Sequence, residues 1–266
     1  MLASNSYLIQ KKRNNRIVEN NNRTALITGS GQNIGRGIAL RLAQEGFNIV
    51  LNGSRNRSRC VEVAREINKL GGQSTIAMGD IGIEEDTIAI VAEAKRAFKK
   101  VDVLINNAAI RPSQKFLDTT QKDWDRVMSV NLQSVIWLSR ACLPSMLTQG
   151  WGRIVNFTGM NAQKGYPGKA AVTVSKHAVW GFTKSLSVEF GCRGVTANII
   201  SPGTFPGDDL VPKEGSELEQ LKSANPMGRL GHSSDIAGLI SYLCSKEGEF
   251  MNGQLLQVNG GMTVQF

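Results

Sequence analysis

A glycine-rich turn between two apolar segments is the first feature of the sequence whose residue types could do chemistry. Residues 28–35 read Thr-Gly-Ser-Gly-Gln-Asn-Ile-Gly, and they follow the β-branched run 24–28, which is typical of a buried parallel strand. Glycines let backbone N–H groups come close to a ligand, and a helix that starts after the turn directs its positive end to the same place. The turn therefore predicts a site for the pyrophosphate of a dinucleotide.

The charges after the second predicted strand, residues 48–51, indicate which dinucleotide binds. A carboxylate there bonds the ribose 2′-hydroxyl of NAD, whereas a guanidinium can grip the 2′-phosphate of NADP. Residues 47–60 hold no aspartate or glutamate but three arginines, Arg55, Arg57 and Arg59. We expect NADP(H) as the cofactor and Arg55 as its main contact, with at least one of the other two arginines facing solvent at a helix start.

Four further motifs follow in order: Asp80-Ile81, Asn106-Asn107-Ala108-Ala109, Pro202-Gly203 and Asn259-Gly260-Gly261. With the glycine-rich turn, they make residues 23–264 resemble the short-chain dehydrogenase/reductase family. The family's turn reads TGxxxGxG, which this chain matches at Thr28, Gly29 and Gly35. Asn33 stands at the middle glycine, where asparagine tolerates left-handed geometry. The resemblance implies cofactor contacts from Gly29, Asn33, Ile34, Gly35, Arg55, Asp80, Ile81, Asn107, Ala108, Lys176, Pro202 and Gly203.

The resemblance also implies a reaction, in which hydride passes between nicotinamide and a carbonyl while a tyrosine hydroxyl moves the proton. The family's lysine, four residues after that tyrosine, corresponds to Lys176, and its asparagine on the helix after the fourth strand corresponds to Asn131. The tyrosine position holds Val172, and the serine position thirteen residues earlier holds Gly159. Valine has no proton to give and glycine has no hydroxyl, so the standard mechanism is not expected to operate.

Tyr166 is the nearest hydroxyl that could replace the missing tyrosine. It lies ten residues before Lys176, so the one-turn relation on a helix is lost, but its turn, residues 165–168, runs beside the substrate pocket in this fold. We hypothesise that Tyr166 is the acid/base or binds the substrate; the alternative is a partly buried tyrosine that braces a loop. The pocket is expected to be lined by Met160, Asn161, Tyr166 and Phe205, under a lid formed by residues 204–226.

The elements that must position these residues alternate along the chain. Strands are predicted at residues 24–28, 48–51, 75–78, 101–105, 153–157, 195–200 and 255–258. Helices are predicted after the glycine-rich turn and at residues 60–70, 84–98, 122–147, 170–190 and 235–245. This order indicates one α/β domain of the doubly wound Rossmann type, a seven-stranded parallel sheet with helices on both faces. Ligands are then expected at the carboxyl ends of the strands.

The composition argues against a membrane-spanning, a disulfide-bonded or a metal-binding protein. The chain has 266 residues, 41% of them hydrophobic, and no apolar run approaching the roughly 20 residues of a membrane-spanning helix. The four cysteines form no CxxC pair, so we expect reduced thiols, no metal site and a cytoplasmic location.

The net charge of +9 is unevenly distributed. Residues 1–22 are interpreted as a flexible, basic, asparagine-rich extension to a domain of residues 23–266. Such a tail is more often a solvated arm than a nucleic-acid reader, so nucleic-acid binding is not the expected function. Recruitment of a polyanion by this tail is kept as an alternative.

Two readings of the function therefore remain open. The first is an NADP(H)-dependent oxidoreductase acting on a small carbonyl or alcohol with a non-standard proton donor. The second is a non-redox lyase or isomerase, or a catalytically inactive cofactor-binding protein on the same fold. By resemblance, a homotetramer is expected, formed through residues 122–147 and the helix that carries Lys176.

Overall fold

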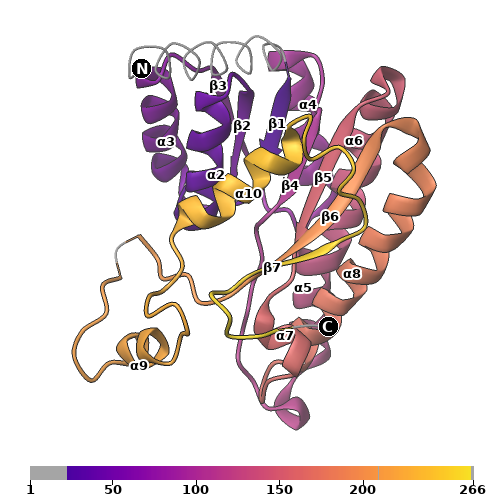
Figure 1. The fold of residues 1–266 in the computed structure, drawn as a ribbon. Helices are drawn as coiled ribbons and strands as arrows, with labels where there is room; N and C mark the ends of the chain where they lie inside the picture. The colour runs from indigo at the N-terminus through magenta and orange to yellow at the C-terminus, as the bar shows by residue number, and fades with distance from the viewer. Residues whose placement is uncertain (1–22, 209, 265–266) are drawn as a thin grey trace, which may run out of the picture.

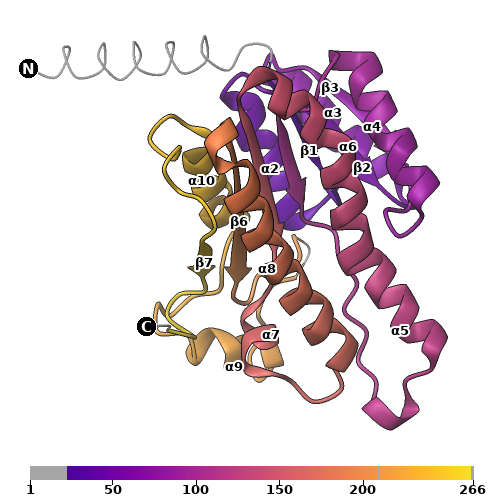
Figure 2. The ribbon, with the colours of Figure 1, turned by 90° about the vertical axis from the view of Figure 1, so that its right-hand side faces the viewer.

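The computed structural model describes residues 23–208 and 210–264, so the extension predicted at residues 1–22 lies outside the described part of the chain. Seven parallel strands form one sheet in the order β3-β2-β1-β4-β5-β6-β7 (Figures 1 and 2). This confirms the predicted doubly wound sheet. The strands are β1 (Thr24–Ile27), β2 (Asn48–Gly53), β3 (Ser74–Met78), β4 (Val103–Asn106), β5 (Gly152–Phe157), β6 (Val195–Pro202) and β7 (Leu255–Val258).

Helices cover both faces of the sheet (Figures 1 and 2). One face carries α2 (Asn33–Gln44), α3 (Arg57–Lys69) and α10 (Ser233–Cys244). The other carries α4 (Glu84–Phe98), α6 (Ser134–Gln149) and α8 (Ala170–Phe190). Two short 3₁₀ turns lie at Phe116–Asp118 and Gly191–Arg193.

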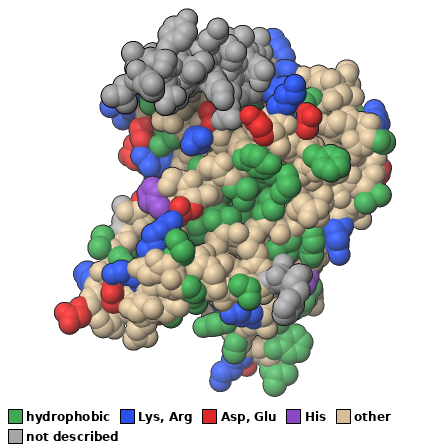
Figure 3. All heavy atoms as spheres, viewed as in Figure 1, with side chains coloured by type: hydrophobic (Ala, Val, Ile, Leu, Met, Phe, Trp, Pro, Cys, Tyr) green, Lys and Arg blue, Asp and Glu red, His purple; other side chains and the backbone are tan. Residues whose placement is uncertain are grey.

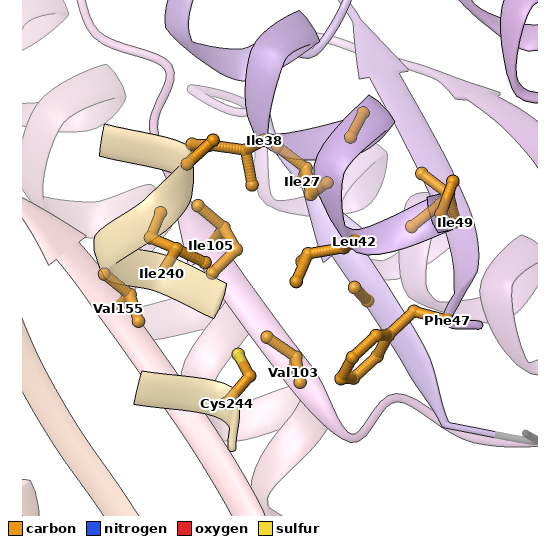
Figure 4. Packing of buried hydrophobic residues seen from close by; sticks show 14 of the residues in the cluster. Ile27, Ile38, Leu42, Phe47, Ile49, Val103, Ile105, Val155, Ile240 and Cys244 are labelled. Carbon is orange, nitrogen blue, oxygen red and sulfur yellow. The ribbon is translucent and has the colours of Figure 1, made fainter. Parts of the chain in front are cut away.

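A buried apolar core lies on each side of the sheet because successive strand residues point to opposite faces. In β1, Ile27 belongs to the core under α2 and α10, whereas Leu26 belongs to the core under α4, α6 and α8. Figure 4 shows the first core, in which Ile38 of α2 and Ile240 of α10 lie close to Ile27 and Ile105. Burial on both faces explains why the strands read as continuous apolar runs.

The strand order places the site. The order reverses between β1 and β4, so the connections that leave these two strands run to opposite faces and open a crevice at their carboxyl ends. The glycine-rich turn follows β1, and the Asn106-Asn107-Ala108-Ala109 motif begins at the end of β4.

Several predicted boundaries change in the structure. The stretch predicted as one helix over residues 122–147 consists of α5 (Gln121–Met128), a π-helical turn at Ser129–Gln133, and α6. Helix α3 begins at Arg57 rather than at residue 60, because the side chain of Asn56 caps it by accepting a hydrogen bond from the N–H of Arg59. Two helices were missed, α7 (Met160–Lys164) and α9 (Glu217–Ser223), since both are too short to show a helical period.

Candidate active site

The glycine-rich turn joins β1 to α2 through left-handed backbone at two positions. Gly29 has φ +63° and Asn33 has φ +51°, so asparagine does take up the geometry that the sequence pattern requires of it. Gly35 lies against the turn so closely that an added Cβ would be 2.3 Å from the carbonyl oxygen of Gly29. Because the first N–H groups of a helix have no acceptor within it, the first turn of α2, which contains Ile34, suits a phosphate.

The turn is fastened to the segment that follows β4. The side-chain amide of Asn107 donates to the carbonyl oxygens of Thr28 at 2.9 Å and Gly29 at 3.2 Å. The Thr28 hydroxyl in turn accepts a hydrogen bond from the N–H of Ala108 at 3.0 Å. The structure therefore brings together Gly29, Asn107 and Ala108, three of the residues expected to contact the cofactor.

Asn52 is a positioning residue of this turn that the sequence analysis missed. Its buried side-chain amide donates to the carbonyl oxygen of Ala77 at 3.0 Å. Its backbone carbonyl oxygen accepts from the N–H of Ser30 at 2.9 Å. Asn52 thus ties β2 to both β3 and the glycine-rich turn. The available signal was a polar residue directly after the apolar part of β2.

The three arginines after β2 occupy different surroundings. Arg55 is exposed in the loop between β2 and α3, and its charge reaches Asp80, whose pKa it helps to lower. Arg57 is exposed at the first position of α3, as expected for one of the two remaining arginines. Arg59 packs its Cβ beside Gly31 of the glycine-rich turn, where a Cβ added to the glycine would lie 3.2 Å away.

Asp80 and Ile81 follow β3 at the same edge of the sheet. Burial raises the pKa of Asp80, but the hydrogen bond from Arg126, the N–H of Gly82 and the nearby arginine charges together hold it below its usual range. The Asp80 carboxylate therefore stays ionised and is fixed by the 2.6 Å contact with Arg126. Ile81 is buried in the core under α4 and α6. Arg126 comes from α5, and no motif singled it out.

Strand β6 ends at Pro202, and Gly203 and the lid predicted over residues 204–226 follow it. The N–H of Gly203 donates to the carbonyl oxygen of Val258 at 2.9 Å, which holds the start of the lid to β7. Phe205 packs over Gly231, where an added Cβ would lie 2.5 Å from its ring. A cavity of about 410 Å³ is lined by residues 203–205, 225, 227, 229–231, 235 and 257–261.

The lid contacts the glycine-rich turn directly. The N–H of Asn33 donates to the Asp208 carboxylate at 2.8 Å, and the N–H of Asp208 donates to the side-chain oxygen of Asn33 at 2.9 Å. A negative charge thus lies at the N-terminus of α2, the end of a helix that attracts anions. A cavity of about 250 Å³ lies beside this contact, between the lid and the starts of α2 and α10.

Lys176 lies on α8 with its ammonium buried. Its Nζ donates to the carbonyl oxygen of Phe157, at the end of β5, at 2.8 Å. Burial lowers the pKa of Lys176 to about 7, and the charge of Arg111 acts in the same direction. The amine is therefore close to losing its charge near neutral pH, and an anionic or hydrogen-bond-accepting ligand beside it would favour the charged form.

The stability of the protein is expected to depend on pH through Lys176. Its pKa is about 7 in the folded chain against an ordinary 10.5, so between these values the unfolded chain binds a proton that the folded chain does not. The Lys176 contribution to the free energy of unfolding should therefore be constant below about pH 7 and increase from about pH 7 to about pH 10. Urea unfolding of the wild type and of Lys176→Met at several pH values measures it as a difference. A difference that does not change with pH would contradict the prediction.

Asn131 lies buried in the π-helical turn, a kind of irregularity that is common at functional sites. Its side chain accepts from the N–H of Ile110 and donates to the Ile110 carbonyl oxygen, both at 2.9 Å, and it also donates to the hydroxyl of Ser175 at 3.2 Å. Asn131 therefore holds the segment after β4 against α8. The backbone groups that it satisfies belong to this segment and not to its own helix.

Neither Val172 nor Gly159 offers a hydroxyl beside Lys176. Val172 is buried on α8 and packs with Val127, Ile110 and Trp124 in a small apolar cluster. A Cβ added to Gly159 would meet no described atom within 4 Å, so the position is open. The apolar packing of Val172 and the open space at Gly159 leave this part of the site without its expected proton and hydrogen-bond donors.

Tyr166 lies on the turn between α7 and α8. Its side chain is 55% exposed, and its carbonyl oxygen accepts from the N–H of Lys169 at 3.1 Å. The turn also contacts the segment after β4, because the N–H of Gln114 donates to the carbonyl oxygen of Gly168 at 2.9 Å. The Tyr166 side chain is thus exposed rather than partly buried, and the turn that carries it contacts the segment that Asn131 holds. Met160 and Asn161 open α7, at the base of the same connection.

Comparisons with known proteins agree with this arrangement. A family model described as enoyl-(acyl carrier protein) reductase matches residues 29–263. The chain is 34% identical to the 3-oxoacyl-(acyl-carrier-protein) reductase of Staphylococcus aureus over 241 residues, which is 90% of this chain and 98% of the relative. It is 34% identical over 242 residues to nodulation protein G of Azospirillum brasilense, covering 91% and 98% of the two chains.

A third relative is the acetoacetyl-CoA reductase of Cupriavidus necator, at 33% identity over 240 residues, covering 90% of this chain and 98% of the relative. No helix in the described residues is both long and apolar enough to cross a membrane. The family match, the relatives of similar length and the strand order all agree with the motifs on which the resemblance was based. The chain belongs to the short-chain dehydrogenase/reductase family of oxidoreductases.

Proposed function

We propose that this protein is an NADP(H)-dependent oxidoreductase that acts on a small carbonyl or alcohol substrate with a non-standard proton donor. The observation that carries the proposal is a glycine-rich turn fastened to the segment after β4, with the buried Lys176 bonded to the end of the neighbouring strand β5. NADP(H), rather than NAD(H), is supported by Arg55 and by the absence of an acidic residue between positions 47 and 60. The cofactor would supply the hydride, and the chain would bind, orient and protonate the substrate.

The function is tested by isotope transfer. NADPH deuterated at nicotinamide C4 is incubated with the protein and a panel of small ketones, oxo acids and oxo thioesters. The panel includes acetoacetyl-CoA, because that substrate class is named for two of the relatives. Deuterium in the alcohol product is the expected result. Turnover of a substrate without any change in the nicotinamide would contradict oxidoreductase chemistry.

Replacing Tyr166 by phenylalanine is expected to reduce turnover by about 100-fold or more with unchanged NADPH affinity, if its hydroxyl transfers the proton. The exposed side chain of Tyr166, on a turn whose Gly168 contacts Gln114, supports this role. Tyr242→Phe on α10 is the matched control, since that tyrosine is also partly exposed but lies on a different helix. Undiminished turnover in Tyr166→Phe would remove Tyr166 from the mechanism.

A second function is favoured by one specific observation. The packing of Val172 in an apolar cluster and the open space at Gly159 fit a protein that binds the nucleotide without standard redox chemistry. Loss of one oxyanion donor typically costs on the order of 100-fold in rate. A non-redox lyase or isomerase, or an inactive cofactor-binding protein, is therefore the alternative, and NADPH binding without deuterium transfer to any member of the panel would favour it.

Replacing Asp208 by asparagine is expected to tighten NADPH binding by about 3- to 10-fold. In the proposed complex the cofactor pyrophosphate approaches the N-terminus of α2, where the Asp208 carboxylate now accepts the N–H of Asn33. Removing the charge relieves repulsion between two anions at one helix end. Fluorescence titration with NADPH measures the change, and Glu214→Gln, an exposed lid residue, is the control. Weaker NADPH binding in Asp208→Asn would contradict the idea that the Asp208 carboxylate and the cofactor pyrophosphate compete for the N-terminus of α2.

The assembly and location are also proposals. We propose a cytoplasmic homotetramer of a domain spanning residues 23–266, formed through α5, α6 and α8. Figure 3 shows hydrophobic side chains gathered on the surface near α10, β6 and β7, and acidic and basic side chains interspersed around them. That distribution favours protein contacts over a nucleic-acid surface on this face. Binding of a polyanion that disappears on deletion of residues 1–22 would support the alternative that this segment recruits a polyanion.

A further inference from the structure

The cavity of about 410 Å³ lies at the base of the lid. The lid leaves the sheet after β6, extends beyond the strand ends with α9 and returns to the start of α10 (Figure 1). Both ends of the lid line the cavity, one through residues 203–205 and the other through residues 225–231, and the end of β7 with the loop after it, residues 257–261, lines the third side. The glycine-rich turn, which the structure describes in full, does not line it.

Hydrogen bonds within the walls hold this cavity in place. The N–H of Gly231 donates to the carbonyl oxygen of Thr204 at 3.0 Å, which joins the two ends of the lid. The side-chain amide of Asn225 donates to the carbonyl oxygen of Asn259 at 3.1 Å, and the Asn259 amide donates to the carbonyl oxygen of Thr263 at 3.0 Å. The walls therefore keep their positions without a ligand, as is usual for a small-molecule site.

Glycines keep side chains out of the cavity. Gly260 has φ +65°, and an added Cβ would lie 2.4 Å from Oδ1 of Asn225. At Gly231 an added Cβ would lie 2.5 Å from the ring of Phe205. Glycine is thus required at both positions for close packing of the wall. The surface that these positions offer to a ligand consists of neutral backbone groups.

The charged side chains of the wall neutralise each other. Among the described residues that line the cavity, Arg229 and Asp235 carry charge. They form two parallel hydrogen bonds, of 2.7 Å and 3.0 Å, and the Asp235 carboxylate also accepts the N–H of His232 at 2.9 Å. A charged ligand would lose its hydration here without gaining an unpaired opposite charge, so the wall favours an uncharged one.

The ring of Phe205 separates this cavity from the smaller one beside α2. Phe205 and Gly231 line both cavities, and the ring lies over the glycine, so their contact forms the partition. Met227, Leu230 and Val258 complete the apolar part of the larger cavity, and Met227, which is 63% exposed, lies at its mouth. A molecule bound in the larger cavity therefore leaves the first turn of α2 accessible to a cofactor.

We infer that the cavity at the base of the lid is a second ligand site, which binds an uncharged small molecule with an apolar ring or short chain and a neutral polar group such as an amide or a hydroxyl. Its volume lies within the range of about 300–1,000 Å³ that is usual for such sites. The apolar body packs against Phe205 and Leu230, and the polar group meets the backbone of the glycines. The site goes beyond the proposed oxidoreductase function, because binding there needs neither NADP(H) nor a proton donor.

The experiment compares 3-phenylpropanamide with 3-phenylpropanoate, which have the same apolar body and differ in charge. Calorimetry on the full chain without cofactor is expected to show the amide binding at least about tenfold more tightly than the anion. In protein labelled with ¹³C at the methionine methyl groups, the amide should shift the Met227 signal, which Met227→Leu identifies. The signal of Met146, buried under α6, should not move. NADPH should change the amide affinity by less than about threefold.

Met227→Asp places a charge at the mouth of the cavity and should weaken amide binding by at least about tenfold. Leu210→Asp is the matched control, because Leu210 is 58% exposed on the same lid but lines the smaller cavity. Its affinity for the amide should stay within about twofold of the wild type. Equal binding of amide and anion, an unmoved Met227 signal, an equal loss in Leu210→Asp or displacement of the amide by NADPH would each overturn the inference.

Discussion

Replacing Arg55 by alanine is expected to weaken NADPH binding by about 10- to 100-fold and to change NADH binding by less than about twofold. The 2′-phosphate is the only part of NADPH that NADH lacks. A charge-assisted hydrogen bond from a guanidinium to this phosphate contributes to the binding of one dinucleotide and not of the other. Arg55 stands two residues after the end of β2, and its charge reaches Asp80 across the same edge of the sheet.

Fluorescence titration of both dinucleotides measures this selectivity. Arg57→Ala is the matched control, because Arg57 is equally basic and exposed but lies at the first position of α3. Its effect should stay within about threefold. Arg55→Glu should go further and reverse the preference, since a carboxylate repels the phosphate and can bond a ribose hydroxyl. Equal losses for NADPH and NADH in Arg55→Ala would show that Arg55 does not select the cofactor.

Much of the fold could be predicted because each strand and helix carries its own periodic signal. The helix predicted over residues 84–98 and the strand over residues 255–258 have these same bounds in the structure. Boundaries shifted where a local side-chain contact decides the end of an element, as Asn56 does for α3. The division of α5 from α6 by a π-helical turn was not predictable, because the apolar pattern continues through it.

The candidate site was predictable only in part, for a physical reason. Residues that contact the glycine-rich turn and also belong to a sequence motif, such as Asn107, were identified from the residue types of the motifs and their order along the chain. Residues that act across long separations were missed. Arg126 contacts Asp80 from 46 residues away, and Asp208 contacts Asn33 from 175 residues away. A single sequence carries no record of such pairs, since neither partner needs a special spacing to meet the other.

Arg111 illustrates the same limit. It lies five residues after the end of β4 and reads as an ordinary loop arginine. Its surroundings follow from Asn131 and Lys169, which fix its backbone from two separate helical segments. The missing hydroxyls at positions 159 and 172 were visible in the sequence, but the hydrogen bonds from Asn131 and Lys169 to this segment became apparent only in the folded chain.

Replacing Gly35 by alanine is expected to weaken NADPH binding by about 100-fold or more and to lower the free energy of unfolding by about 2–4 kcal/mol. The added Cβ would stand 2.3 Å from the carbonyl oxygen of Gly29, 2.8 Å from the side-chain nitrogen of Asn107 and 2.9 Å from the Cα of Ser30. Two of these three atoms are backbone and the third fastens the turn to β4. Relief therefore requires the turn to move away from its phosphate-binding position.

Gly181→Ala on α8 is the matched control for the same chemical change. A Cβ there meets no described atom within 4 Å, and alanine favours a helix interior over glycine. That variant should be more stable by about 0.5–1 kcal/mol and should bind NADPH as the wild type does. If the free energy of unfolding falls in Gly35→Ala and rises in Gly181→Ala, the loss of stability at Gly35 is due to contact of the new Cβ with the turn. Wild-type NADPH affinity in Gly35→Ala would mean that the turn does not hold the pyrophosphate, and the proposed cofactor site would have to be abandoned.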